Sequence, residues 1–76
     1  MKVYAVVAKG RYAEVDGASV AVHRRAFEDK GVADRVAPEF ATSIEGTGGP
    51  HFTYRDMRGQ VIELELVPRE HPGEAV

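Results

Sequence analysis

The chain has 76 residues, a mass of 8.3 kDa and a net charge of −2, which allow one small domain with one modest core. It contains no cysteine, which excludes a disulfide framework, a thiolate metal site and a cysteine nucleophile. No apolar run approaches the roughly 20 residues that a membrane-spanning helix needs. The apolar N-terminal segment is too short for a signal peptide, so we expect a cytoplasmic protein with no membrane partner.

The first third of the chain predicts a β-hairpin. Valine supplies 11 and alanine 10 of the 33 hydrophobic residues, a composition that favours a sheet over a helix bundle. Residues 2–8 are almost wholly apolar and predict a strand, which the Lys9-Gly10 dipeptide can end. Residues 16–17 form an Asp-Gly turn signal, and residues 18–23 predict the next strand. Residues 11–15 fit either a short extra strand or a loop; we favour the loop, hence one irregular hairpin.

Residues 25–37 are the only candidate for a helix. Negative charge at Asp29 suits a helix N-terminus, whereas Gly31 weakens the helix by about 1 kcal/mol. Pro38 predicts that the helix ends or kinks near residue 37, although a further turn over residues 38–44 stays open. The apolar face comprises Val32, Ala33, Val36, Ala37 and Phe40.

Residues 45–50 hold three glycines and a proline and predict a loop. This loop does not fit a phosphate-binding motif, because no lysine follows it and the next segment predicts a strand rather than a helix.

Residues 52–67 predict a second hairpin with a three-residue loop at 57–59. In this register Tyr54 pairs with Ile62 and Phe52 with Leu64, so that the apolar side chains share the face beneath the helix.

The turn chemistry agrees with that register. Asp56 is a favoured first residue of a type I turn, and Gly59 can take the left-handed position after it. Thr53, Arg55 and Glu63 would then lie together on the solvent-exposed face, and Gly59→Val would destabilise the hairpin without changing its register.

These elements predict an α+β fold in the order β-β-α-β-β, with a small antiparallel sheet and one helix packed on a face. We expect a single domain over residues 1–68 and a polar C-terminal tail over residues 69–76.

No set of residues assembles into a catalytic or metal motif. The histidines His23, His51 and His71 lack the i, i+4 spacing of a zinc site, and no hydroxyl residue lies in a nucleophile-elbow sequence. Glu63 and Glu65 are better explained as solvated charges than as an acid/base pair. We therefore expect no enzyme activity, cofactor or metal; an enzyme would require His23 and His51 to converge on a carboxylate around a cavity.

Arginine beside exposed tyrosine is typical of protein interfaces. We therefore expect a non-enzymatic module that binds another protein through a sheet edge or an arginine-bearing hairpin. A strand edge left open also favours a homodimer, formed by edge pairing or by sheet faces. Nucleic-acid binding would need the arginines gathered on one face away from acidic groups, and the predicted neighbourhood of Arg55 and Glu63 argues against it. The candidate partner-binding residues are Arg11, Tyr12, Arg24, Thr53, Arg55, Arg58 and Glu63.

The opening Met1-Lys2-Val3-Tyr4-Ala5-Val6-Val7-Ala8-Lys9-Gly10, a following strand and the segment Arg25-Ala26-Phe27-Glu28-Asp29-Lys30-Gly31-Val32-Ala33 resemble small uncharacterised α+β proteins of actinobacteria and their phages. That resemblance implies a compact domain without an assigned activity, and a phage-type inhibitor of a host protein is one form it can take. The same opening is similar to the partial RNase H-like domain of HicB-type antitoxins, which implies a nucleic-acid-linked regulator as the alternative. The chain lacks the Pro-Gly turn before the helix and the DNA-binding segment of that family.

Overall fold

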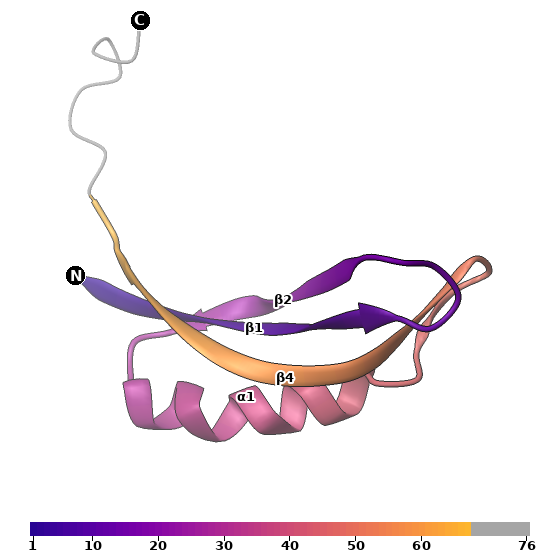
Figure 1. Ribbon diagram of the computed structural model, residues 1–76. Helices are drawn as coiled ribbons and strands as arrows, with labels where there is room; N and C mark the ends of the chain where they lie inside the picture. The colour runs from indigo at the N-terminus through magenta and orange to yellow at the C-terminus, as the bar shows by residue number, and fades with distance from the viewer. Residues whose placement is uncertain (68–76) are drawn as a thin grey trace, which may run out of the picture.

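The computed structural model describes residues 1–67 as one sheet with a helix on one face. The strands pair antiparallel in the order β2-β1-β4-β3. No other element of the described residues covers the second face of the sheet (Figure 1). The predicted α+β class and β-β-α-β-β order are therefore confirmed. The elements are β1 (Lys2–Tyr12), β2 (Ala18–Phe27), α1 (Lys30–Ile44), β3 (Gly48–Gly49) and β4 (Phe52–Glu65).

The first hairpin is a single one, as preferred from the sequence. Strand β1 runs on through Gly10 to Tyr12, and residues 13–17 form the loop before β2. Gly17 in that loop has a φ of +140°, a conformation that favours glycine. The helix assignment for residues 25–27 is wrong, because β2 continues to Phe27 and pairs there with Tyr4 of β1.

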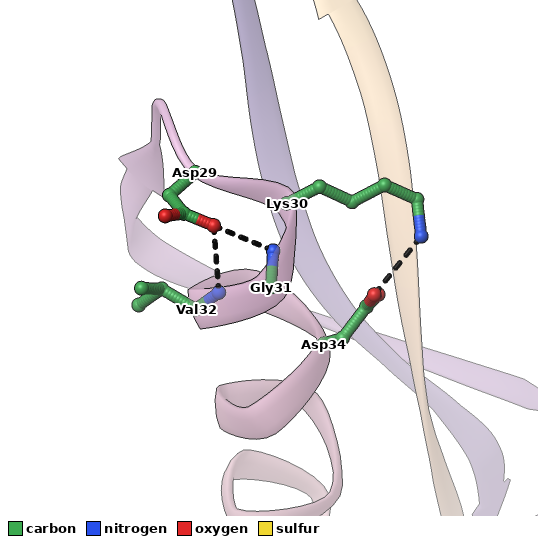
Figure 2. A network of polar contacts seen from close by, with 5 residues as sticks. All are labelled: Asp29, Lys30, Gly31, Val32 and Asp34. Carbon is green, nitrogen blue, oxygen red and sulfur yellow. Dashed lines mark hydrogen bonds and ion pairs between the residues drawn. The ribbon is translucent and has the colours of Figure 1, made fainter.

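Helix α1 begins with a capped first turn (Figure 2). Asp29 is the N-cap residue, and its carboxylate accepts hydrogen bonds from the backbone N–H groups of Gly31 at 2.7 Å and Val32 at 3.3 Å. Lys30 donates a hydrogen bond to Asp34 at 2.9 Å, and this contact raises the pKa of the exposed Lys30 ammonium group above its ordinary value. The negative charge noted at Asp29 therefore lies at the observed helix N-terminus, although α1 begins at Lys30 rather than at the predicted residue 25.

The helix does not end near residue 37 but continues through Pro38 to Ile44. Its buried face consists of Ala33, Ala37 and Ala41, spaced by four residues and therefore aligned along one side. Proline inside a helix removes a backbone hydrogen bond, which disfavours continuation. Packing of this alanine face on the sheet opposes that cost over the last two turns, because most helical stability in proteins comes from such contacts.

The predicted second hairpin is wrong in its placement. Residues 52–65 form the single long strand β4, and residues 57–59 lie inside it rather than in a loop. β4 pairs with β1, placing Val61 opposite Val6. The hairpin partner of β4 is the two-residue strand β3, which lies in the segment predicted as a loop and pairs with residues 52–53.

A β-bulge explains the error. The register between β1 and β4 shifts where Gly10 faces both Asp56 and Met57, and Asp56 has a φ of +54°. The extra residue changes which positions face the helix: Tyr54 does so before the bulge, and Met57 and Val61 do so after it. The left-handed position predicted for Gly59 therefore belongs to Asp56 instead.

Asp56→Gly is expected to raise the free energy of unfolding by about 1 kcal/mol, because a left-handed backbone costs roughly 1–2 kcal/mol in a residue with a β-carbon. The variant also loses the contact between Asp56 and Arg11, but both side chains are exposed, and such pairs contribute little. Asp56→Val is expected to be destabilising, since branching at the β-carbon makes this backbone worse. Urea unfolding compares the two variants, and equal stabilities would contradict a left-handed residue here.

The core lies between the helix and one face of the sheet. Val6 and Ala33 are fully buried and pack with Ala37. Beyond the C-terminal end of α1 the rings of Tyr12 and Tyr54 continue this layer, with centroids 5.9 Å apart, and Phe52 packs edge-on against each at 5.4 Å. The aromatic residues of β1 and β4 therefore lie on the helix side of the sheet.

Candidate functional site

The sheet face turned away from α1 is the most distinctive surface of the described chain. Side chains alternate along a strand, so residues next to the helix-packed Val6, Ala8 and Val61 point to the opposite side. Direct cross-strand partners share a face, which extends the assignment to all three long strands. We call this surface the open face; it comprises Val3, Ala5, Val7, Lys9, Arg11, Ala18, Val20, Val22, Ala26, Thr53, Arg55, Arg58, Gln60, Ile62 and Leu64.

Four cations gather at one end of the open face. Lys9 of β1 lies directly opposite Arg58 of β4, and Arg11 lies directly opposite Arg55. All four residues are exposed. Like charges placed directly opposite one another destabilise a sheet, and here two such pairs follow in succession. We call these four residues the cationic end.

Carboxylates are largely kept away from the cationic end. Asp56 in the bulge contacts Arg11, which leaves three cations without a described ion-pair partner on this face. The expectation that Glu63 lies beside Arg55 is wrong, because the strand is continuous and alternation from Val61 turns Glu63 to the helix side. There Glu63 pairs with the ammonium group of Lys2 at 3.5 Å.

The other end of the open face is apolar. Val3 lies opposite Leu64, Ala5 opposite Ile62, and Val7 opposite Val22 of β2. Leu64 is 48% exposed and Val22 65% exposed, although both are large hydrophobic residues. The open face therefore combines a charged end with an apolar end on the same three strands.

The structure brings together only part of the predicted set of binding residues. Arg11, Arg55 and Arg58 meet at the cationic end, and Thr53 lies on the same face next along β4. Tyr12 instead joins the aromatic layer on the helix side, and Glu63 lies on that side too. Arg24 lies on β2 between Val22 and Ala26, where the register with β1 shifts, and it is therefore not part of the cationic end.

Lys9 is not among the predicted binding residues, because the Lys9-Gly10 dipeptide is typical of a turn. The i, i+2 spacing of Lys9 and Arg11 was the available signal, since residues two apart on a strand point to the same side. Gly10 between them serves a packing role: a β-carbon there would overlap the side chain of Met57 and the carbonyl oxygen of Arg55.

The histidines do not converge. His23 on β2 packs against Phe27 and Phe40, with ring centroids 5.6 and 5.1 Å apart respectively. His51 lies between β3 and β4, at the opposite edge of the sheet from β2. Within residues 1–67 no group of three or more histidine, aspartate or glutamate side chains is placed to hold a metal ion. His71 and the predicted tail lie outside the described residues.

A shallow depression of about 380 Å³ lies on the outer side of α1. Its walls are mostly apolar and come from Pro38, Glu39, Thr42 and Ser43 of this one helix. A substrate site normally draws polar groups from several elements, so the depression suggests no reaction. Over residues 1–67, no helix is both long and apolar enough to cross a membrane.

Comparison with known proteins identifies no relative. No protein-family model matches the chain, and neither a curated protein nor a solved structure is significantly similar to it. The function must therefore be inferred from the residues of the chain itself.

Proposed function

We propose that the chain is a small, non-enzymatic protein-binding module that binds an acidic segment of another protein at its cationic end. The observation that carries this proposal is the presence of two cross-strand pairs of like charge, Lys9 opposite Arg58 and Arg11 opposite Arg55. Like charges directly opposite each other destabilise the free sheet, and Asp56 offsets this only for the pair that contains Arg11. An anionic partner would offset that repulsion, so an arrangement unfavourable for folding is favourable for binding.

The spacing of the cations suits an extended acidic segment. Neighbouring strands lie about 4.8 Å apart, and residues two apart on a strand about 7 Å apart. Lys9 and Arg11 therefore repeat at the same interval as alternate carboxylates on an extended partner chain. Arg55 and Arg58 add guanidinium groups, which bind carboxylates through two parallel hydrogen bonds.

Two features favour a protein partner over a nucleic acid. The aromatic rings of Tyr12, Phe52 and Tyr54 pack together on the helix side, so the open face of the described chain offers no ring on which a base can stack. The whole chain has a net charge of −2, which disfavours a long polyanion such as a nucleic acid more than a short acidic segment.

One observation supports the second candidate, an antitoxin-type nucleic-acid-linked regulator. Glu63 lies on the helix side, so the arginines share a face without that carboxylate. This candidate predicts affinity for duplex DNA or RNA that falls steeply as the salt concentration rises.

Affinity capture tests the proposal with the full chain as bait in a cell lysate, followed by mass spectrometry. Proteins retained by the wild type are expected to be lost with the double variant Arg55→Ser/Arg58→Ser. They should be retained by Arg35→Ser, which removes an exposed arginine from α1. Retention of the same proteins by the double variant, or no retained protein at micromolar bait, would contradict the proposal.

The double variant is also expected to be slightly more stable than the wild type, by about 0.2–1 kcal/mol for each relieved pair. Urea unfolding measures this gain. Loss of binding together with a gain in stability cannot be explained by unfolding of the variant. Fluorescence anisotropy with labelled duplex DNA and RNA at low ionic strength tests the second candidate, which absence of binding would exclude.

A further inference from the structure

We propose that the apolar end of the open face binds the same surface of a second copy of this chain, forming a two-fold symmetric homodimer. The apolar end is defined as Val3, Ala5, Val22, Ile62 and Leu64, together with Leu66 just beyond β4. The surface is separate from the cationic end, so the dimer does not rest on the proposed function.

The distribution of large aliphatic side chains is the first observation behind this proposal. The chain has two leucines, and both lie about half exposed: Leu64 at 48% and Leu66 at 52%. The helix-side core instead buries small residues such as Val6, Ala33 and Ala37. A chain of this size has few large aliphatic residues with which to build a core. Exposed leucines contribute no free energy of burial to folding unless a partner covers them.

The distribution of charge favours a second copy of this chain as the partner that covers these exposed aliphatic residues. Asp56, in the bulge at the cationic end, is the one carboxylate adjoining the open face within the described strands. A two-fold axis that runs across the strands at the apolar end places leucine, isoleucine and valine against the same residues of the partner. It also sends the two cationic ends to opposite extremes of the dimer, where they do not repel each other. A shift of the axis toward Lys9, or an axis along the strands, would superpose the cations, so the charges disfavour both of these alternatives.

The size of the surface sets the expected affinity. Three strands at about 4.8 Å and five residues at about 3.3 Å give an apolar area of roughly 14 Å by 17 Å. Stable complexes bury about 800 Å² on each partner, which is more than this area provides. The dimer is therefore expected to be weak and to form progressively with concentration.

Sedimentation velocity from about 10 µM to about 1 mM tests the association. The mass of the wild type is expected to rise from 8.3 kDa toward twice that value. Leu64→Lys and Val22→Lys, on β4 and β2, should each weaken association at least tenfold. Thr42→Lys on the outer side of α1 is the matched control and should associate like the wild type. A wild type that stays at 8.3 kDa at 1 mM would overturn the proposal.

Cross-linking locates the interface without a disruptive charge. The chain has no cysteine, so Ala5→Cys introduces a unique thiol near the proposed axis. Packed sheets lie about 10 Å apart, and a bifunctional maleimide of that length should link two Ala5→Cys chains. Glu39→Cys, on the outer side of the helix, should not be linked.

Dimers that persist in Leu64→Lys, or equal cross-linking of the two cysteine variants, would overturn the face-to-face arrangement. Edge pairing of β4 is the main competitor and predicts the first of these results. The affinity-capture experiment tests Arg55 and Arg58 at the cationic end, whereas these experiments test the apolar end. The proposed acidic partner and the proposed homodimer can therefore fail independently.

Discussion

Replacing Gly59 by valine is expected to lower the free energy of unfolding by about 3 kcal/mol or more. A β-carbon on Gly59 would overlap the backbone carbonyl group of Ala37, where α1 crosses β4. Relief requires the helix to move away from the sheet, and overpacking of this kind costs about 1–3 kcal/mol or more. For a domain this small, that is a large part of the total stability.

Gly59→Ala distinguishes this close approach from a turn role. In a left-handed turn, alanine would cost only about 1 kcal/mol. Here alanine brings the same overlapping atom as valine and is expected to approach its effect. Gln60→Val on the open face is the control and should change stability by less than about 0.5 kcal/mol. Urea unfolding measures all three variants, and a Gly59→Ala protein as stable as the wild type would contradict the close approach.

Met57→Ala is expected to cost about 2–5 kcal/mol, the range for truncating a buried methionine. Met57 is only 7% exposed and packs with Ala8 and Ala41 on the helix side. Its sulfur atom also accepts a hydrogen bond from the buried hydroxyl group of Ser19 at 3.3 Å, and truncation leaves that group without its partner.

Two neighbouring substitutions are the controls for Met57. Met57→Leu keeps most of the volume and should cost less than about 1.5 kcal/mol. Arg58→Ala removes an exposed side chain from the opposite face and should not destabilise the protein. Thermal or urea unfolding followed by circular dichroism provides the measurement. If Met57 were the tip of a hairpin loop, Met57→Ala would be nearly neutral, and that result would contradict the long strand.

Local signals in the sequence predict the first hairpin, whereas the predicted helix start at residue 25 precedes the observed start at Lys30. The Asp-Gly dipeptide at residues 16–17 lies in the observed loop, and Asp29 caps α1. The end of the helix was not predictable in this way. Continuation through Pro38 depends on the contact of Ala37 and Ala41 with β4, which only the assembled sheet provides.

The second hairpin shows why alternation alone can mislead. Phe52, Tyr54, Ile62 and Leu64 all occupy even positions, which is what a three-residue turn would require. In the structure the bulge at Asp56 reverses the alternation, so the first two face the helix side and the last two the open face. Ile62 and Leu64 can leave the helix side because the alanine face of α1 packs very close to β4. At that distance only the small Gly59 and Val61 fit between the helix and the strand.

The candidate site was predictable in residue type more than in arrangement. Arg11, Arg55 and Arg58 were identified from their basic character, which does not depend on register. The predicted turn at residues 57–59 places Glu63 on the same face, and the predicted turn at Lys9-Gly10 leaves Lys9 out of the set. Cross-strand neighbours depend on pairing between β1 and β4, which are separated by 39 residues of chain and leave no local signal.

The bulge also constrains how the chain can change by insertion or deletion. Removal of one residue at Asp56 would restore uninterrupted alternation and rotate the start of β4 by half a turn. Phe52 and Tyr54 would then emerge on the arginine-bearing side, while Arg55 would turn inward beneath the end of α1. A single lost codon would therefore damage folding and partner recognition together, whereas length changes in the loop at residues 13–17 would spare both.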